Sequence, residues 1–257
     1  MERSAKICGR FWPSHSADIA MQLILGMHGP QELYMILITT EKENIHSRIR
    51  GGQMKYRRFG KTDWQVSEIG YGMWGMAGWT GSDDDESMTS LQRSVDLGLN
   101  FFDTPWGYGE GHSEALLGRL IKQNPDKKLY TATKIPPKNF IWPSRREFTL
   151  DDCFPPGHVE KYIHNSLKNA KLESFDLMQF HVWEDSWVED DRWAKKMDEL
   201  RIQGLISAVG ISINRWEPWN GVQAVRSGMI DAVQVLSLIH ISEPTRLKTR
   251  ARMPAAA

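Results

Sequence analysis

The feature that most constrains the fold of this chain is an alternation of apolar and amphipathic runs between residues 54 and 235. The apolar runs are short enough to be strands, and the amphipathic runs have the spacing of helices with one buried face. Strands that alternate with helices at intervals of about 30 residues indicate repeated β–α units and a parallel sheet. The expected strands are residues 66–73, 100–103, 129–134, 175–181, 206–212 and 230–235.

Capping residues support the helices expected between these strands. Ser82 is the expected cap of the first helix, because acidic residues fill the turn that follows it, and Gly98 stands where this helix would end. Residues 55–67 are expected to form a small hairpin ahead of the first strand, with residues 60–63 as its turn. The other expected helices are residues 113–121, 158–172, 191–202 and 219–225.

The number of units defines the predicted fold class. A complete (β/α)8 barrel of the TIM type needs about 250 residues for eight units, whereas residues 54–235 contain six expected strands. We therefore predict an α/β protein with an incomplete (β/α)8 barrel of six β–α units and an N-terminal β-hairpin. Residues 1–53 show no sustained period and are expected to be an irregular extension, and residues 236–257 are expected to be a disordered tail.

Five of the expected strands are apolar until a polar or ionisable residue at the C-terminal end. Because the C-terminal ends of parallel strands meet at one mouth of a barrel, where active sites lie, these side chains should converge. Side-chain alternation would turn the residue directly before each of them toward the helices. An Asp, a Lys and a His at one mouth would make a candidate acid–base site. The five residues are Asp103, Lys134, His181, Ser212 and Gln234.

Composition argues against several classes of partner. The formal net charge of zero gives no electrostatic reason to expect binding to nucleic acid or to an anionic membrane. Cys8 and Cys153 are too few for a disulfide framework and lack metal-ligand spacing. No segment reaches the roughly 18 uninterrupted apolar residues of a membrane helix. We therefore expect a cytoplasmic protein without a bound metal.

Several motifs resemble those of the aldo-keto reductases. Residues 100–109 (NFFDTPWGYG), followed by residues 111–118 (GHSEALLG), are similar to the signature in which an Asp and a Tyr lie five positions apart. Residues 133–134 (TK) resemble the lysine strand of the family, and residues 179–181 (QFH) resemble its histidine strand. Residues 210–214 (GISIN) and 231–234 (DAVQ) are similar to the strands that hold the nicotinamide carboxamide.

The resemblance implies reduction of an aldehyde or ketone, a small carbonyl substrate, by hydride transfer from NADPH, with NADH not excluded. Tyr108 would donate a proton to the carbonyl oxygen, on which charge develops as the hydride arrives. A free tyrosine has a pKa of about 10, so a nearby cation is needed to ease release of the proton. Lys134, paired with Asp103, would be that cation, and His181 would hydrogen-bond the carbonyl oxygen.

The resemblance also assigns residues to the cofactor. Ser212, Asn214 and Gln234 would orient the nicotinamide ring, and Asp103 belongs to the cofactor site as well as to the catalytic group. Ile213 stands where many relatives have an asparagine directly after the serine, so Asn214 lies one position further along.

Other residue groups leave alternatives open. Taken alone, each catalytic candidate also fits a structural role. Asp103 fits a helix cap and Lys134 a solvated strand end. His181 fits a core histidine and Tyr108 a turn residue. The acids of residues 184–185 and 189–191 favour a solvated face over a metal site, because no histidine has ligand spacing to them. Tryptophans expected near strand ends could line an apolar pocket or pack beneath loops: Trp74, Trp79, Trp106, Trp142 and Trp183.

The similarity to the family stops just after Val235. Relatives continue into further strands whose loops hold the phosphates of the cofactor. Residues 236–246 (LSLIHISEPTR) instead resemble the peptide encoded by a common sequencing adapter. We therefore expect a barrel truncated after its sixth strand, a foreign tail and impaired activity. Two other functions stay open: a non-catalytic nicotinamide-binding regulatory subunit and an inactive gene fragment.

Overall fold

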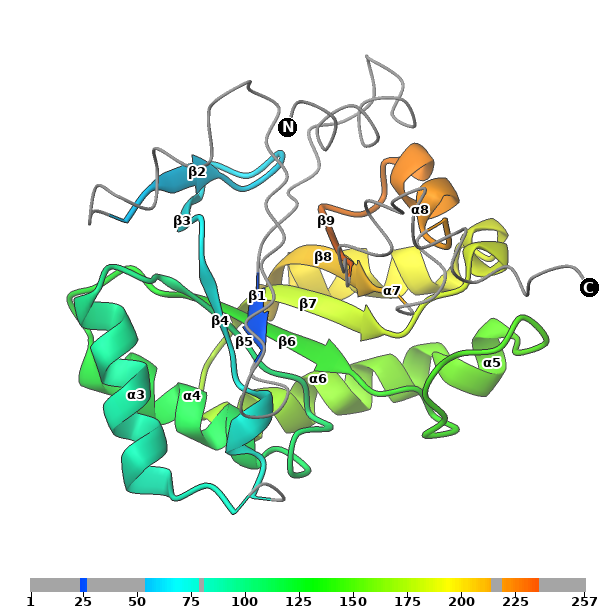
Figure 1. The fold of residues 1–257 in the computed structure, drawn as a ribbon. Coiled ribbons are helices and arrows are strands. Elements are labelled where there is room, and N and C mark those ends of the chain that lie inside the picture. The colour runs from blue at the N-terminus through cyan, green and yellow to red at the C-terminus, as the bar shows by residue number, and fades with distance from the viewer. Residues whose placement is uncertain (1–23, 27–53, 79–80, 214–218, 236–257) are drawn as a thin grey trace, which may run out of the picture.

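The computed structural model describes residues 24–26, 54–78, 81–213 and 219–235. Within them, the main sheet has seven strands in the order β1-β4-β5-β6-β7-β8-β9, and every neighbouring pair is parallel. The sheet curls into part of a TIM-type barrel, and β4 to β9 follow one another in chain order (Figure 1). The predicted fold class, an incomplete α/β barrel, is confirmed.

The strands have the following bounds: β1 (Ile24–Gly26), β2 (Tyr56–Arg58), β3 (Gln65–Ser67), β4 (Gly70–Gly72), β5 (Phe101–Asp103), β6 (Tyr130–Ile135), β7 (Phe175–His181), β8 (Ile206–Ser212) and β9 (Ala232–Gln234). The helices are α3 (Asp84–Asp96), α4 (His112–Gln123), α5 (Leu150–Cys153), α6 (Pro156–Ala170), α7 (Arg192–Ile202) and α8 (Val222–Ser227), with 3-10 turns η2 (Trp74–Met76) and η3 (Asp185–Glu189). None of these described helices has the length and apolarity that crossing a bilayer requires.

The N-terminal part of the barrel differs from the expected first strand. The hairpin of β2 and β3 is present, but it includes the start of the strand expected at residues 66–73, and β4 covers only residues 70–72. Side-chain hydrogen bonds explain the break. Ser67 donates its N–H to Asn100 Oδ1 at 2.7 Å, and its hydroxyl donates to the Ile69 carbonyl at 2.6 Å. These bonds turn the chain between β3 and β4.

Within the stretch expected to be irregular, residues 24–26 form β1, which pairs in parallel with β4. Residues 33–40, an apolar run within the same stretch, lie outside the described residues.

Two helices begin at capping residues that the sequence reasoning did not identify. The cap of α3 is Asp83 and not Ser82, because the Asp83 carboxylate accepts from the N–H groups of Asp85 and Glu86 at 2.9 and 3.0 Å. A carboxylate that bonds two free N–H groups of the first turn is a strong cap. The short helix α5 was not expected, and it is fixed by a capping box between Thr149 and Asp152.

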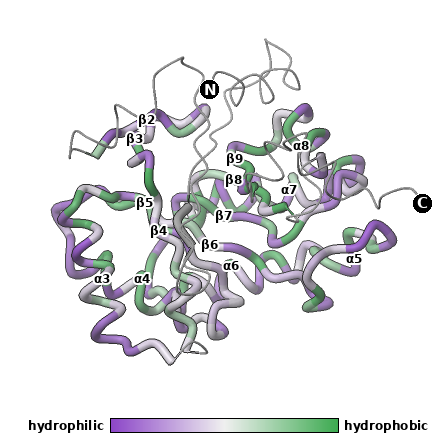
Figure 2. The backbone as a smooth tube through the Cα atoms, viewed as in Figure 1, coloured by the Kyte–Doolittle hydropathy of each residue, from purple (hydrophilic) through white to green (hydrophobic). Residues whose placement is uncertain are grey.

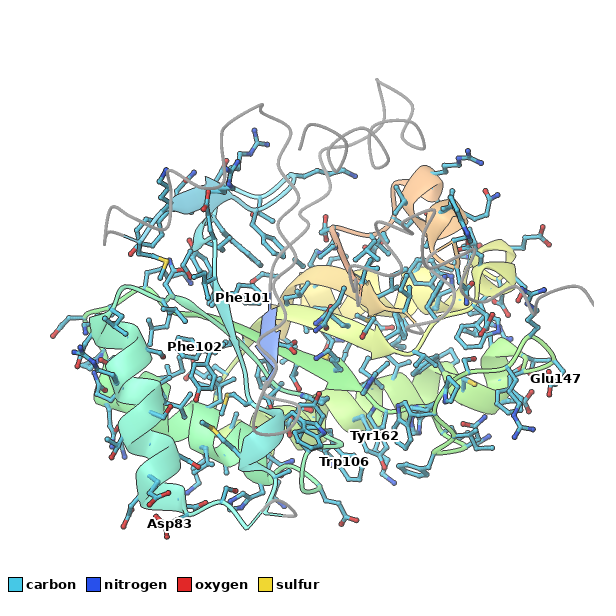
Figure 3. All side chains as sticks on the ribbon, in the orientation of Figure 1. Asp83, Phe101, Phe102, Trp106, Glu147 and Tyr162 are labelled. Carbon is cyan, nitrogen blue, oxygen red and sulfur yellow. The ribbon has the colours of Figure 1, made fainter. Side chains whose placement is uncertain are left out.

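Side-chain alternation divides the core into two layers, as predicted. Phe101 and Phe102 are both fully buried, yet they belong to separate apolar clusters on opposite sides of β5 (Figure 3). Figure 2 shows hydrophobic residues around β8 and β9 and hydrophilic stretches along the outer helices and loops. The inner cluster consists of Phe59, Val66, Phe101, Tyr130, Ala132, Leu177, Ala208 and Ala232. The larger outer cluster lies between the sheet and its helices.

The β2–β3 hairpin contributes to the inner cluster and covers one end of the barrel. Phe59 stacks on Phe101 at a centroid distance of 5.4 Å, and Trp64 stacks on Tyr130 at 5.2 Å. Lys61 reaches across and donates to the Gly228 carbonyl at 3.2 Å. These contacts leave the opposite end, where the strands finish, for the polar residues of the candidate site.

The close packing of α4 against α6 yields a test of the outer layer. A Cβ added at Gly118 would lie 1.8 Å from the Ala170 carbonyl oxygen, so Gly118→Ala must push the two helices apart. Overpacking of this kind costs about 3 kcal/mol of unfolding free energy, to be measured by urea unfolding. Gly157→Ala is the matched control, because nothing lies within 4 Å of an added methyl group there. Equal losses of stability in the two variants would contradict the packing described.

Candidate active site

The polar residues that end the strands lie at one edge of the sheet. His181, Ser212 and Gln234 are direct register partners across β7, β8 and β9. Asp103 ends β5, and Lys134 is the penultimate residue of the neighbouring strand β6. Parallel pairing of the strands therefore brings side chains that are far apart in the sequence to the same mouth.

Asp103 and Lys134 form an ion pair inside the barrel. Lys134 Nζ donates to Asp103 Oδ2, and the two side chains are only 2–3% exposed. Two further donors reach the same carboxylate: Gln179 Nε2 lies 3.2 Å from Oδ1, and Gln234 Nε2 lies 3.4 Å from Oδ2. A buried ion pair needs further hydrogen bonds to its remaining lone pairs, and these amides supply them for the Asp103 carboxylate.

Burial acts strongly on the lysine of this pair. The loss of solvent around Lys134 lowers the pKa of its ammonium group, and the adjacent Asp103 carboxylate opposes this shift. Removal of Asp103 would leave the ammonium group buried without a counter-ion, which is the costliest way to break such a pair. The charged state of Lys134 therefore depends on how well Asp103 is held.

Tyr108 follows β5 in a glycine-rich loop and lies beside the ion pair. Lys134 Nζ is 5.9 Å from the centre of the Tyr108 ring. Burial raises the pKa of Tyr108, and the negative charge of Asp103 raises it further. This direction is opposite to the lowering expected from Lys134. Burial is the larger cause and the charge of Asp103 adds to it, so Tyr108 keeps its proton near pH 7.

The backbone of the Tyr108 loop is tightly packed. Gly109, Glu110 and Gly111 have consecutive positive φ angles of 69°, 51° and 98°. A Cβ at Gly109 would lie 2.5 Å from the Ala77 carbonyl oxygen, and one at Gly111 would lie 2.0 Å from Asn169 Nδ2. Only glycine combines this backbone conformation with so close an approach, so the loop and its tyrosine are fixed against their neighbours.

A buried glutamate that sequence reasoning missed binds the same region from the helix layer outside the barrel. Glu114 on α4 is 0% exposed and accepts hydrogen bonds from Thr133 Oγ1 at 2.6 Å and Asn169 Nδ2 at 2.9 Å. Burial raises the Glu114 pKa, and bonds from Thr133, Asn169 and Ser166 oppose the shift. Thr133 directly precedes Lys134, so Glu114 joins the tyrosine loop to the lysine strand. The one signal in the sequence was an acid on the apolar face of α4.

His181 has an unusual environment. Its Nδ1 atom is buried, and no described residue offers it a hydrogen-bond partner. Burial and, second, the positive charge of Lys134 lower the pKa of His181 to about 3. The imidazole is therefore neutral near pH 7, and a neutral imidazole carries one N–H donor and one acceptor nitrogen.

The residues assigned to the cofactor are described in part. Gln234 directs Nε2 toward Asp103, while its Oε1 atom is buried without a hydrogen-bond partner among the described residues. Ser212 lies across the ladder from both Gln234 and His181. Asn214 lies outside the described residues.

A row of aromatic rings borders the mouth. Trp142 donates its indole N–H to the His181 carbonyl at 3.2 Å, and the two rings are 5.8 Å apart. Phe140 lies 6.2 Å from Trp142 and 6.0 Å from Trp106, which meets Tyr162 edge-on at 4.9 Å (Figure 3). Phe140 and Trp142 are 47% and 41% exposed, so this row presents an apolar surface next to His181.

The other tryptophans do not all fit a pocket wall. Trp183 is fully buried and packs against Trp187 and Trp193, so it belongs to the core. Trp74 is partly buried in η2, and Trp79 lies outside the described residues. A hollow of about 470 Å³ opens between the loop after β6 and the start of α6. It shares Phe140 and Tyr162 with the aromatic row, but Asp103 and Lys134 do not line it.

The acidic residues after β7 have structural partners. Glu184 is only 4% exposed and accepts from Asn220 Nδ2 at 2.9 Å, so the expectation of a solvated face is wrong for this residue. Asp185 accepts from the backbone N–H of Gln223 at 2.8 Å, at the start of α8. Among the described residues, no three His, Cys, Asp or Glu side chains form a group that could hold a metal ion.

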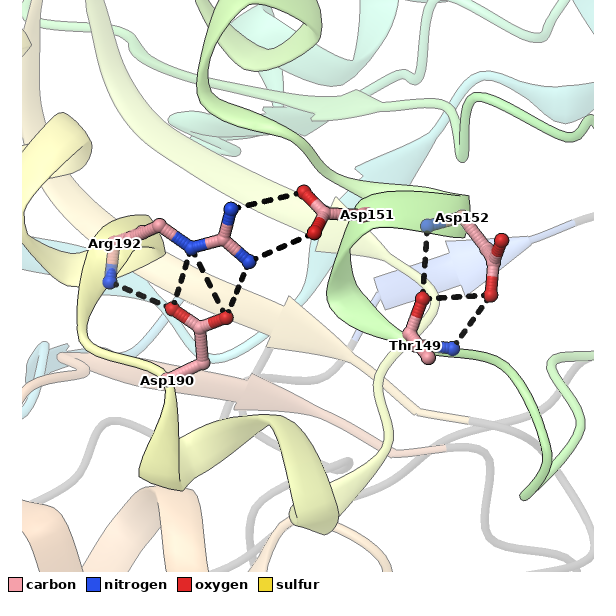
Figure 4. A network of polar contacts seen from close by, with 5 residues as sticks. All are labelled: Thr149, Asp151, Asp152, Asp190 and Arg192. Carbon is pink, nitrogen blue, oxygen red and sulfur yellow. Dashed lines mark hydrogen bonds and ion pairs between the residues drawn. The ribbon is translucent and has the colours of Figure 1, made fainter.

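Arg192 connects two loops that flank the mouth. Its guanidinium bonds both oxygens of Asp151 at 3.0 Å and also binds Asp190, beside the Thr149–Asp152 capping box (Figure 4). Forked pairing of this kind fixes direction as well as distance. The segment after β6, which carries Phe140 and Trp142, is thereby tied to the start of α7.

The pKa of His181 leads to a direct test by NMR. Between pH 5 and pH 8 its ring resonances should not shift, whereas a histidine in a peptide titrates near about 6.5. As the pH falls through that value, the unfolded chain takes up a proton that folded His181 does not bind until about pH 3. His181 therefore lowers folding stability as the pH falls across this window. His181→Asn assigns the resonance, and a midpoint near neutrality would contradict the described environment.

Comparison with known proteins supports a family assignment. Residues 68–245 match the model of the Aldo/keto reductase family. The chain is 31% identical over 162 residues to aldo-keto reductase YhdN of Bacillus subtilis strain 168, covering 62% of this chain and 47% of that protein. It is 24% identical over 171 residues to the NADH-specific methylglyoxal reductase of Escherichia coli K12, covering 61% and 51% of the two chains.

Solved structures agree with this assignment. The glycerol dehydrogenase AKR11B4 of Gluconobacter oxydans is 26% identical, with a TM-score of 0.53 over 72% of this chain and 55% of that chain. The chain spans about half the length of the curated relatives it matches. The family model matches residues 68–245, and the barrel and the buried ion pair agree with it. This chain therefore belongs to the aldo/keto reductase family.

Proposed function

We propose that this chain carries the catalytic group of an enzyme that reduces an aldehyde or ketone by hydride transfer from a nicotinamide cofactor, with NADPH as the preferred donor. The observation that carries the proposal is the buried Asp103–Lys134 ion pair with Tyr108 beside it. Buried, satisfied charges at the C-terminal mouth of a barrel are typical of catalytic sites. A relative from Novosphingobium aromaticivorans, 28% identical over 165 residues, is named 6-dehydroglucose reductase.

The residues present fit a nicotinamide carboxamide. Gln234 Oε1 is a buried acceptor without a partner among the described residues, and a carboxamide offers two N–H donors. Gln234, Ser212 and Asn214 would hold the carboxamide. A bound nicotinamide cofactor supplies the hydride, and the protein orients it and tunes its surroundings.

Tyr108 is the proton donor in this proposal. Its raised pKa keeps the hydroxyl protonated across the physiological range. As charge develops on the carbonyl oxygen of the substrate, the hydroxyl donates its proton to that oxygen. Lys134 then stabilises the charge left on the tyrosine oxygen, because its ammonium group is close and screened by little solvent.

His181 orients the substrate. Because the imidazole is neutral near pH 7, it can donate one hydrogen bond to the carbonyl oxygen without competing with Tyr108 as an acid. The exposed rings of Trp142 and Phe140 would contact the rest of the substrate.

Replacement of the proton donor tests this mechanism. Tyr108→Phe removes the hydroxyl and keeps the ring, so kcat should fall on the order of 100-fold or more. The Kd for reduced nicotinamide should stay unchanged, because Tyr108 is not among the proposed carboxamide contacts. Turnover is followed by loss of the reduced-nicotinamide absorbance with a panel of carbonyl compounds. Tyr71→Phe is the matched control, since its hydroxyl bonds to Ser90 on α3.

Three outcomes would count against parts of the proposal. Unchanged kcat in Tyr108→Phe would transfer the acid role to another group. Faster turnover with NADH than with NADPH would reject the cofactor preference. Nicotinamide binding without turnover of any carbonyl compound would favour a non-catalytic binding subunit.

A further inference from the structure

A buried glutamine contacts the carboxylate of the proposed catalytic pair inside the barrel. Gln179 is on β7, two residues before His181, and is 1% exposed. In the sheet register it lies between Lys134 on β6 and Gly210 on β8. Its side chain points into the barrel interior, where it meets Asp103. An amide so deeply buried is costly unless it is hydrogen-bonded.

The contact of Gln179 with Asp103 is complementary to that of Lys134. Gln179 Nε2 donates to Oδ1 at 3.2 Å, while Lys134 Nζ donates to Oδ2. A carboxylate held through one oxygen can rotate about the bond to its Cβ atom, whereas donors on both oxygens define its plane. The amide of Gln179 does not titrate, so it is a donor at every pH at which the protein folds.

Gly210 leaves the space that Gln179 occupies. A Cβ at Gly210 would lie 3.0 Å from Gln179 Cγ and 3.1 Å from the Ala232 carbonyl oxygen. Its backbone lies on the ladder between these two residues. A larger residue at this position would therefore press on the Gln179 side chain.

We propose that Gln179 is a positioning residue, which acts through Asp103 to keep the carboxylate turned toward Lys134, with Gly210 providing the room. Its effect on turnover rests on the proposed function. Its effect on the charge of Lys134 does not, because that charge can be measured without a substrate.

The groups around Lys134 determine the expected effect. Within the described part of the chain, the titratable side chains that face it are Asp103 on β5, Tyr108 on the loop after β5 and His181 on β7. Asp103 is the one that supports the ammonium charge against burial. If the Gln179 donor is lost, Asp103 is held less firmly, and its carboxylate stabilises the ammonium charge of Lys134 less. The pKa of Lys134 should then fall further.

The first test measures the titration of Lys134 in the full chain. Gln179→Leu keeps the approximate size of the side chain and removes the donor. NMR of ¹³C-labelled lysine should show proton affinity at Lys134 reduced about tenfold, equal to one pH unit in the midpoint. Lys134→Met assigns the resonance. Gln203→Leu on the exposed end of α7 is the matched control and should leave the Lys134 midpoint unchanged.

The second test uses a variant whose donor depends on pH. In Gln179→Glu, the new carboxyl is protonated at low pH and can donate to Asp103 as the amide does. As the pH rises, this carboxyl ionises, loses its donor and adds a like charge beside Asp103. The ratio of its kcat to that of the wild type should therefore fall with rising pH. A ratio that is independent of pH would contradict the contact between residue 179 and Asp103.

The possible results separate this proposal from the proposed function. A wild-type chain without turnover rejects the function, while the Lys134 titration still decides the role of Gln179. An unchanged Lys134 midpoint in folded Gln179→Leu overturns the positioning role. If circular dichroism shows that Gln179→Leu does not fold, Gln179→Met provides the same comparison with an unbranched side chain of similar length.

Discussion

The ion pair between Asp103 and Lys134 is the interaction on which the rest of the candidate site depends. Removing two charges from water costs several kcal/mol per ion even after relaxation, so the surroundings must hold both groups firmly. Adjacent strands β5 and β6 bring the two side chains together, and amides from β7 and β9 bond the remaining carboxylate positions. On the far side of β6, Glu114 fixes Thr133, the residue before the lysine. The pair is thus supported from inside and from outside the barrel.

Burial, reinforced by the charges of this pair, determines the protonation state of the neighbouring tyrosine and histidine. Tyr108 keeps its proton because burial and Asp103 both raise its pKa, and His181 stays uncharged because burial and Lys134 both lower its pKa. At neutral pH the mouth therefore presents two uncharged hydrogen-bonding side chains around an internally compensated pair. Such an arrangement needs little rearrangement when charge develops on a reacting oxygen, which is the essence of electrostatic preorganisation.

The sequence predicted local features well and non-local features poorly. Alternation placed Phe101 and Phe102 on opposite sides of β5, because a period of two residues is a property of the strand itself. The prediction of one continuous first strand was wrong, because the hydrogen bond between Ser67 and Asn100, 33 residues away, turns the chain there. The bond from Gln179 to Asp103 spans 76 residues, and no local pattern indicates it. Composition also could not distinguish the core residue Trp183 from the exposed Trp142, because only tertiary packing separates them.

The bond from the Trp142 indole to the His181 carbonyl has a consequence for how this protein can be observed. It fixes an exposed aromatic ring to the backbone of the strand that carries the histidine. Any molecule that settles against His181 must change the polarity and water content around this indole, which is 41% exposed. Indole emission responds to both. The chain therefore carries an intrinsic fluorophore at the rim of its own candidate site, although its signal must be separated from that of the other tryptophans among eleven in the sequence.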